Sequence, residues 1–424
     1  MRTFDVIRRR QLLGGLAGAA LGACAPRSTG PSRAPSRVRT IPETTFRVRT
    51  EYPSLPPLPD EVYAARRAAA RERARSAGAD VILATSGSAN FGYLAGADFG
   101  RSERLIALVL SVVGDAVLLA PSFELARVQK RVRATPPASL ILRGWEESED
   151  PIAKVRDAIG ERRAILLEPH TDYAVAAAVH RALGSQATLI DGSGVFEELR
   201  VVKSDEEIAR MQRAVDITED AFAATFARLV VGMREQDVAR IVEEEHRLRG
   251  VRGGALVQFG PSAAFPHGAP TSAPLASATP VLIDGGCSFQ DWQSDVTRTR
   301  WFGDEPPSPR FVTLYNLVHD AQSAAIAAVA PGVPAQAIDR AARAVIARAG
   351  FGPQFTHRLG HGIGMDGHEP VYMVEGNPRP LEPGLVFSVE PGIYIPNELG
   401  VRLEEQVACT STGARVLSQR PPRL

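Results

Sequence analysis

Four acidic residues in two β-prone segments are the strongest candidates for chemistry in this chain. In the segment IDGGCSFQDWQSDVTRT, Asp284 follows an apolar run and Asp295 enters a β-prone stretch. A hairpin whose turn is centred near Phe289 and Gln290 would place the two carboxylates opposite each other on one face. Like charges at this spacing repel, so either one acid is protonated or a cation lies between them. For this segment alone, two unrelated solvated turn acids remain the alternative.

A second segment, FSVEPGIYIPNELGVRLEEQV, has the same arrangement. Glu390 ends one β-prone run and Glu404 lies in another, and folding the segment about Asn397 again puts the two acids opposite each other. Two hairpins that each present facing carboxylates are hard to explain as unrelated solvated acids on the surface. Four carboxylates can balance two dications, and a pair of metals about 3.5–4 Å apart forms the clamp that many hydrolases use.

A histidine-rich segment supplies the remaining donor. The stretch THRLGHGIGMDGHEP contains His357, His361 and His368. It is not the helical zinc motif His-Glu-x-x-His, because Arg358 replaces the glutamate and the glycines would disrupt a helix. A glycine-shaped strand or loop would instead turn His361 toward the carboxylates. A site with mostly oxygen donors and one imidazole suits two divalent ions such as Mn²⁺ best, with Co²⁺, Fe²⁺ or Zn²⁺ as alternatives.

Together these motifs resemble the pita-bread metallopeptidases, the family of prolidase, aminopeptidase P, methionine aminopeptidase and the metal-free creatinase. The stretches DGG, SDVTRT, GHGIG, VEPG and VRLEE match the five metal ligands of that family in order and type. The resemblance implies a metal-bridged hydroxide as the nucleophile. It also implies the following ligand set: Asp284 on one metal, His361 and Glu390 on the other, and Asp295 and Glu404 bridging both.

The resemblance further implies catalytic roles for three residues. Glu390 would carry a proton to the leaving nitrogen, and its alternative is a purely structural ligand. His368 matches the histidine that steadies the tetrahedral oxyanion, and His267, in FPHGAP, matches a histidine that lines the substrate site. For both histidines, the alternative is a hydrogen-bonded structural role.

Three further residues are weaker substrate-site candidates. Arg402 precedes Glu404 by two positions and aligns with a family arginine near the site, with a strand-face ion pair as the alternative. His357 and Tyr394 stand where the family has groups that support the ligands and line the pocket. Core packing is the alternative for each of these two residues.

Two folding units must position these residues. Of the 424 residues, 44% are hydrophobic and 23% charged, which is the balance of a globular protein with a sizeable core. From 60 to 198, short apolar runs alternate with helical patterns, which predicts an α/β domain with a mixed sheet. Its segment GSANFGYLAG resembles the creatinase/prolidase N-terminal domain, which methionine aminopeptidases lack.

Residues 199–424 form the second predicted unit. Ser204 followed by Glu207 is a capping-box pattern that opens a helix to about residue 228. Helices are also predicted at 234–249, 309–330 and 334–349, and β-rich stretches between and after them carry the candidate site residues. This separation of helices from strands predicts an α+β domain. The resemblance identifies it as the pita-bread catalytic domain.

The first 24 residues have the pattern of an export signal. Basic residues Arg8 to Arg10 precede an apolar run about half as long as the ~20 residues of a membrane-spanning helix. The arginine pair resembles a twin-arginine signal, and the stretch LGAC resembles a lipobox that would place a lipid anchor on Cys24. Plain cleavage is the alternative to lipidation. With a Pro/Ser/Arg-rich tether at 25–59, the pattern predicts an exported protein, either periplasmic or a membrane-anchored lipoprotein facing the periplasm.

The resemblance implies hydrolysis of the peptide bond before proline, by an Xaa-Pro dipeptidase or an Xaa-Pro aminopeptidase. Its substrates would be short peptides with proline at the second position, and the enzyme would be a homodimer. The alternatives are a creatinase-like or other C–N hydrolase on the same fold and a non-catalytic binding protein of the family. A net charge of +1 and the lack of basic runs in the folded part argue against nucleic-acid binding.

Overall fold

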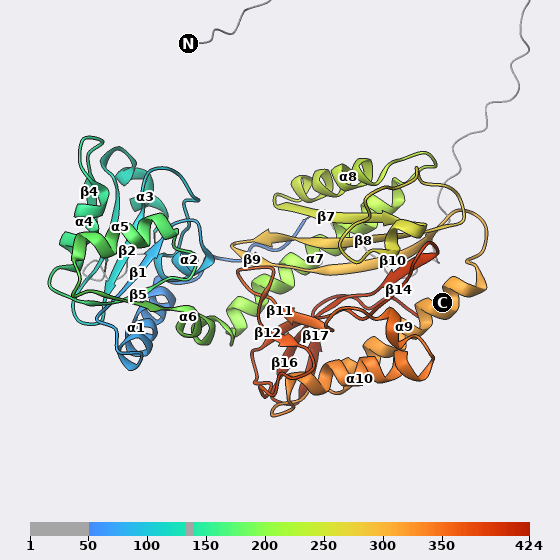
Figure 1. Ribbon diagram of the computed structural model, residues 1–424. Helices are drawn as coiled ribbons and strands as arrows, with labels where there is room; N and C mark the ends of the chain where they lie inside the picture. The colour runs from blue at the N-terminus through green and yellow to red at the C-terminus, as the bar shows by residue number, and fades with distance from the viewer. Residues whose placement is uncertain (1–50, 133–139) are drawn as a thin grey trace, which may run out of the picture. The chain divides into compact units, whose positions relative to one another are not determined.

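The structure is a computed structural model, and it describes residues 51–132 and 140–424 (Figure 1). The predicted export signal, Cys24 and most of the predicted tether lie outside the described residues. Within those residues, none of the helices combines the length and the apolarity that crossing a membrane requires.

The amino-terminal part is built on one mixed sheet. Antiparallel pairing joins the first, second and third strands in chain order, and parallel pairing joins the others. The predicted α/β domain with a mixed sheet is therefore confirmed. Within the described ranges, the strands are β1 (Val81–Thr85), β2 (Ala107–Ser111), β3 (Ala116–Pro121), β4 (Leu140–Trp145), β5 (Ala164–Leu167) and β6 (Thr188–Asp191), in the spatial order β4-β3-β2-β1-β5-β6.

Helices pack on both faces of this sheet. Because successive strand residues point to opposite faces, Ile82 joins a hydrophobic cluster with Ala70, whereas Leu83 joins a different cluster with Val155. Both faces are covered, which explains why β1 to β3 are buried along their whole length. The helices are α1 (Asp60–Ser76), α2 (Ala89–Ala95), η1 (Ser122–Glu124), α3 (Leu125–Arg131), α4 (Pro151–Ile159), α5 (Tyr173–Leu183) and α6 (Ser193–Arg200).

The carboxy-terminal part has two successive blocks, each a helix pair followed by antiparallel strands (Figure 1). This arrangement agrees with the predicted α+β domain. The first block contains α7 (Asp205–Ala227), α8 (Glu235–Leu248), β7 (Arg252–Phe259), η3 (Gly260–Ala264), β8 (Thr279–Phe289), β9 (Trp292–Gln293) and β10 (Val296–Phe302). The second contains α9 (Pro309–Ala327), α10 (Ala335–Arg348), η4 (Gly352–Gln354), β11 (Gly360–Gly362), β12 (Glu369–Met373), β13 (Val386–Val389), β14 (Gly392–Ile395), β15 (Leu399–Arg402), β16 (Glu405–Thr410) and β17 (Gly413–Val416).

Each block has a hydrophobic core between its helices and its strands, and the core of the first block also includes Val386 of β13 and Ala408 of β16. In the first, Phe222 of α7 and Val238 of α8 pack with Ile283 of β8. In the second, Phe311 of α9 and Phe387 of β13 share a cluster. Two cores of this kind hold the strands rigidly, so side chains at the strand ends have fixed positions.

The predicted helices are observed, with ends that differ by a few residues. The capping box that opens α7 is present: the backbone N–H of Glu207 donates to Ser204 Oγ at 3.3 Å, and the N–H of Ser204 donates to Glu207 Oε2 at 2.7 Å. These bonds satisfy backbone donors that the first turn of a helix leaves free. The cap fixes where α7 begins, directly after the amino-terminal part.

Candidate metal centre

Asp284 and Asp295 lie on the same face of the hairpin formed by β8 and β10. Asp284 pairs with Thr297, so Asp295 is its diagonal neighbour and the prediction of two directly opposed carboxylates is wrong. The reason is the turn. Gln290 and Asp291 both have positive φ, 50° and 72°, which makes a tight two-residue turn one position later than predicted and shifts the register by two.

Glu390 and Glu404 lie in a long hairpin that runs from β13 to β16. They stand at the break between its two paired regions, β13–β16 and β14–β15. The predicted turn at Asn397 is confirmed, with φ of 64°, and the same register continues from β14–β15 to β13–β16. At this break, the backbone N–H of each glutamate donates a hydrogen bond to a residue outside the hairpin. The N–H of Glu390 donates to Leu359 O at 2.9 Å, and the N–H of Glu404 donates to Thr297 O at 3.1 Å. The interruption therefore joins this hairpin to the other two segments of the site.

His361 lies in the short strand β11, which is one of the two forms, strand or loop, that the glycine pattern predicted. A Cβ at Gly360 would collide with the carbonyl oxygen of Ser388, so glycine is required for this close approach. The N–H of His361 donates to Ser388 Oγ at 3.0 Å, and its ring Nδ1 lies 3.0 Å from Gly362 O. Burial lowers the pKa of His361 to about 4, so the ring is in the neutral form that binds metals.

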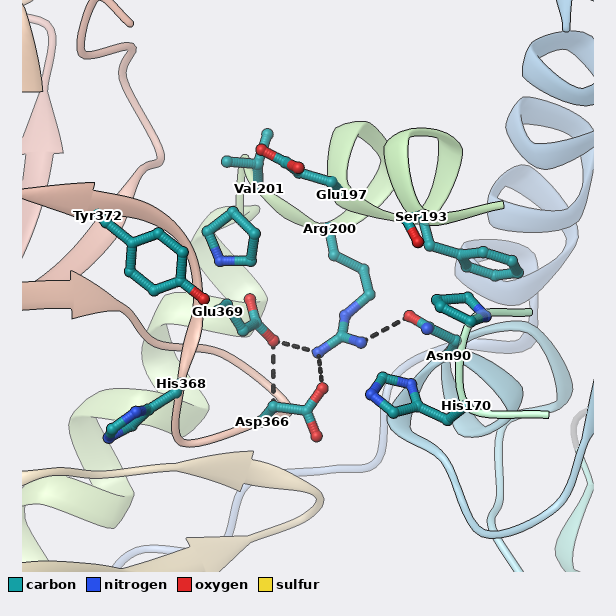
Figure 2. A pocket seen from close by; sticks show the side chains of 13 residues that line it. Asn90, His170, Ser193, Glu197, Arg200, Val201, Asp366, His368, Glu369 and Tyr372 are labelled. Atoms are coloured by element: carbon teal, nitrogen blue, oxygen red, sulfur yellow. Dashed lines mark hydrogen bonds and ion pairs between the residues drawn. The ribbon is translucent and has the colours of Figure 1, made fainter. Parts of the chain in front are cut away.

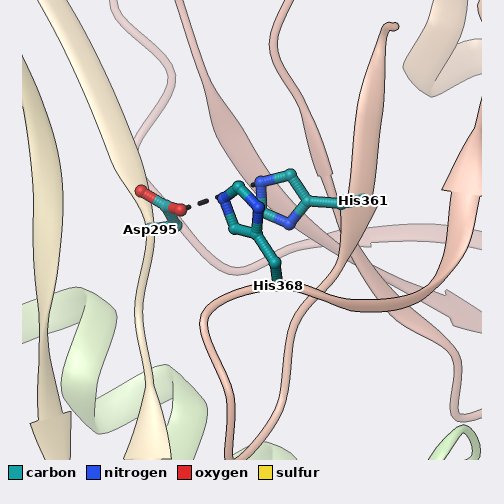
Figure 3. Close-up of side chains that lie close together, drawn as sticks. All are labelled: Asp295, His361 and His368. Carbon is teal, nitrogen blue, oxygen red and sulfur yellow. Dashed lines mark ion pairs between the residues drawn. The ribbon is translucent and has the colours of Figure 1, made fainter. Parts of the chain in front are cut away.

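The four acids converge with His361 and His368 on one cluster. Nε2 of His361 lies 3.4 Å from Glu390 Oε1 and 3.8 Å from Asp295 Oδ2. Three overlapping groups have potential ligand atoms within 4.8 Å of one another. Figure 3 shows one of them, in which the rings of His361 and His368 stack at 3.7 Å beside Asp295. The groups are Asp284, Asp295 and Glu404; His361, Glu390 and Glu404; and Asp295, His361 and His368.

The electrostatics of this cluster fit a bound cation pair. Burial, with the charges of Asp284 and Glu390, raises the pKa of Asp295 well above its ordinary value, and burial with the charges of Asp295 and Glu390 does the same for Glu404. Burial also raises the pKa of Glu390 to about 7. Burial is also the largest influence on Asp284 and would raise its pKa, but the charge of Arg402 together with hydrogen bonds from Thr297 and Arg402 outweighs burial, so that the pKa of Asp284 is lowered. Oε1 of Glu404 is buried and has no hydrogen-bond partner among the described residues. Buried carboxylates that repel one another and retain an unsatisfied oxygen fit divalent cations.

The cluster opens into a cavity of about 490 Å³, called the central cavity below. Pro266, Arg358 and Val374 contribute to its wall. A cavity of this size is large enough for a small peptide. The predicted site residues that line it are His267, Asp284, Asp295, His357, His361, His368, Glu390, Arg402 and Glu404.

Comparison with known proteins agrees with this geometry. The model of metallopeptidase family M24 matches residues 209–411, and the creatinase/prolidase N-terminal domain matches residues 66–202. An uncharacterized peptidase of Staphylococcus aureus (strain MW2) is 33% identical over 341 residues, which cover 78% of this chain and 92% of that protein. This chain belongs to metallopeptidase family M24.

Solved structures place this M24 peptidase among pita-bread dipeptidases and prolidases. The dipeptidase PepE of Mycobacterium ulcerans has a TM-score of 0.78 and 34% identity, covering 87% of this chain and 99% of that one. The Thermococcus sibiricus prolidase has a TM-score of 0.78 and 29% identity over 88% and 99% of the two chains. An Xaa-Pro dipeptidase of Bacillus anthracis has a TM-score of 0.77 and 27% identity over 85% and 99%. The fold and the peptidase class are thus established.

Of the predicted site residues of this M24 peptidase, Tyr394 is the one that does not line the central cavity. Its hydroxyl lies 2.8 Å from Nε2 of His357 and accepts a hydrogen bond of 2.8 Å from Arg402. Arg402 in turn donates to Asp284 Oδ2 at 2.6 Å. Tyr394 therefore contacts two residues of the cavity wall, His357 and Arg402, through its hydroxyl.

Two residues that the sequence reasoning missed also hold the cluster together. The hydroxyl of Thr297 lies 2.5 Å from Asp284 Oδ1 and 2.8 Å from Glu404 Oε2, between two acids of the site. Ser388 contacts Glu390 Oε1 at 3.1 Å as well as the backbone of His361. Both stand two positions from an acid along a strand, and this spacing of two was a signal that could have identified them.

Proposed function

We propose that this chain is a dinuclear metal-dependent peptidase that cleaves the bond between an N-terminal residue and proline. The observation that carries the proposal is the convergence of four carboxylates and one imidazole, from three segments, on one buried cluster. Structural relatives described as a prolidase and an Xaa-Pro dipeptidase support the proline preference. The complete set of five donors favours an active metal enzyme over a creatinase-like mechanism or a binding protein.

The proposed ligand arrangement follows the resemblance and the distances in the cluster. Mn²⁺ is the proposed ion, because most of the donors are carboxylate oxygens. When bound, two such ions would lower the pKa of a water held between them and polarise the carbonyl group of the scissile bond. The residues that would hold them are Asp284 on one ion, His361 and Glu390 on the other, and Asp295 and Glu404 on both.

The side chains of this protein would then position the peptide and move protons. Glu390 would accept a proton from the attacking water and pass it to the proline nitrogen, which must be protonated to leave. His368, whose ring lines the cavity beside His361, would donate a hydrogen bond to the developing oxyanion. His267 would contact the substrate from the cavity wall. The nitrogen of an Xaa-Pro bond carries no hydrogen that a peptidase could bind. A site that contacts only the carbonyl oxygen and protonates the leaving nitrogen therefore suits this bond.

The decisive experiment is hydrolysis by protein loaded with Mn²⁺ or Co²⁺. We expect release of proline from Ala-Pro, or of alanine from Ala-Pro-Ala, and no cleavage of Ala-Ala-Ala at a comparable rate. Removing the metal with a chelator should abolish the activity, and adding Mn²⁺ back should restore it. Full activity of the stripped, chelated protein would exclude the metal mechanism, and equal cleavage of Ala-Ala-Ala would exclude the proline preference.

We also propose that the protein is exported and is anchored through a lipid on Cys24. The proposal rests on the basic and apolar pattern of residues 1–24 and on the LGAC stretch. The Cys24→Ala variant is expected to move from the membrane fraction to the soluble fraction of the cell envelope, as measured by fractionation and immunoblotting. Wild-type protein that is soluble in the same fractionation would contradict the anchor.

The resemblance also implies a homodimer, and we include this in the proposal. Sedimentation equilibrium would measure the mass of the assembly.

A further inference from the structure

An ion pair on helix α10 lies beside residues 355–359, the entry segment that leads into His361. Asp339 and Arg343 are four positions apart, so their side chains lie on the same face of the helix. The guanidinium donates two hydrogen bonds to the carboxylate, from Nε to Oδ2 and from Nη2 to Oδ1, each of 2.9 Å. Asp339 is buried, with 1% of its surface exposed, whereas 34% of the Arg343 side chain is exposed. A bidentate pair of this kind is held in one geometry.

The same two side chains bind the backbone of the entry segment. Nη1 of Arg343 donates to Phe355 O and Nη2 donates to His357 O, both at 2.9 Å. Oδ1 of Asp339 accepts a hydrogen bond of 3.0 Å from the N–H of Leu359. The three backbone groups belong to alternate residues, which is the period of an extended chain. One ion pair therefore fixes the course of the entry segment along the helix.

The entry segment is joined directly to both donors that we assign to one ion. The carbonyl oxygen of Leu359, its last residue, accepts a hydrogen bond of 2.9 Å from the N–H of Glu390. His361 follows two positions later in β11. A displacement of Leu359 would therefore move Glu390 and His361 together. Asp284, which we assign to the other ion, lies on β8, and none of these hydrogen bonds reaches that strand.

A separate set of ion pairs holds the other end of the histidine-rich stretch, beside a cavity of about 470 Å³ (Figure 2). Nη2 of Arg200 lies 2.7 Å from Asp366 Oδ2 and is also paired with Glu369. Nζ of Lys203 lies 2.9 Å from Glu369 Oε2. The two acids flank His368 in the chain. His368 therefore keeps its own support when the entry segment is disturbed, so the effect of the α10 pair is confined to the start of the stretch.

Stability alone does not account for the α10 pair. Taking a carboxylate and a guanidinium out of water costs free energy that largely cancels their attraction, so a buried pair is weak evidence for a stabilising role. What such a pair provides is a set of directed hydrogen bonds, and three of them here reach the backbone of the entry segment. Arg340, on the same helix, gives the comparison. Its Nε lies 2.7 Å from Glu375 Oε2, with 56% and 60% of the two side chains exposed.

We propose that Asp339 and Arg343 are positioning residues of the metal centre, which hold the entry segment so that His361 and Glu390 reach the same ion. The inference rests on the proposed function and deepens it, because it names what orients one half of the ligand set. Groups that orient a metal ligand typically contribute a factor of about 10–100 to metal affinity. The contribution of the α10 pair is therefore expected in the affinity for one of the two ions.

The test titrates chelator-stripped protein with Mn²⁺ and follows binding by calorimetry, without any substrate. We expect wild type to bind two ions per chain. In Arg343→Gln, one of the two ions should bind about 10–100-fold more weakly, and the other should keep its wild-type dissociation constant. Arg343→Lys, whose ammonium keeps the charge but not the planar fork of donors, should lose less affinity. Arg340→Gln is the matched control on the same helix and should bind both ions as wild type does.

The outcomes separate this inference from the function on which it rests. Wild-type affinity for both ions in Arg343→Gln would overturn the role of the α10 pair while leaving Xaa-Pro hydrolysis intact. The role is also overturned if both ions bind more weakly and the thermal midpoint of the metal-free variant falls, since that pattern marks a general loss of structure. Two ions bound by a wild type that cleaves no Xaa-Pro peptide would overturn the proposed function alone. A wild type that binds no second ion would overturn both proposals.

Discussion

The Asp295→Asn variant is expected to lose hydrolysis of Ala-Pro, with kcat/KM lower by about 10³-fold or more, the scale of a lost metal clamp. Asparagine keeps the size of the side chain but removes its charge and one donor oxygen. Asp295 belongs to two of the three ligand groups, with Asp284 and Glu404 and with His361 and His368. The substitution therefore weakens both halves of the proposed centre. Steady-state kinetics and metal content per chain, by atomic absorption, measure the two losses.

The matched control for this variant is Asp304→Asn. Asp304 is exposed, follows β10 in the chain and does not line the central cavity. It should keep both wild-type activity and the wild-type metal content. An Asp295→Asn protein that is folded by circular dichroism, binds two ions per chain and turns over at the wild-type rate would refute the proposed role of Asp295.

Glu390→Gln is expected to stabilise the metal-free protein at neutral pH by about 3 kcal/mol. Burial raises the pKa of Glu390 from 4.5 to about 7, and this change corresponds to that free energy. From pH 4.5 to about 7 the folded state binds more protons at this site than the unfolded chain does, so the wild type loses stability as pH rises. Glutamine does not titrate. The advantage of the variant should thus be absent below pH 4.5, grow up to about pH 7 and then remain constant.

The sign of this difference should reverse when metal is bound. A ligand that binds only the folded state adds stability, and Glu390→Gln would lose much of that gain because it removes a donor. Denaturation midpoints of both proteins, measured from pH 4 to 8 with chelator and with Mn²⁺, test both halves of the prediction. Glu161→Gln, at an exposed glutamate, should show neither effect. A variant less stable than wild type in chelator at pH 8 would contradict the repulsion among the buried carboxylates.

Much of the site could be predicted from local pattern. The glycine-rich stretch around His361 predicted a strand or loop in close contact with its surroundings, and it forms a short strand; Asn397 predicted a turn that sets the register of its hairpin. Such features depend on neighbours in sequence, through period and turn preference. The first hairpin shows the limit of this reasoning. Gln290 and Asp291 carry no Asn-Gly or Asp-Gly signal, so a turn with two positive φ angles was missed and Asp284 was paired with the wrong residue.

The order and type of the donors, and the elements that carry them, were determined by the sequence itself, because strands, turns and caps form from local preferences. The tertiary structure alone decided how these elements meet. The hydroxyl of Thr297 contacts Glu404 across 107 positions of the chain, and Arg402 contacts Asp284 across 118. Those contacts decide which carboxylates are satisfied, and they commit the guanidinium of Arg402 to Asp284. No local pattern encodes such distant pairings, since they form only when the packing of the hydrophobic cores brings the strand ends together.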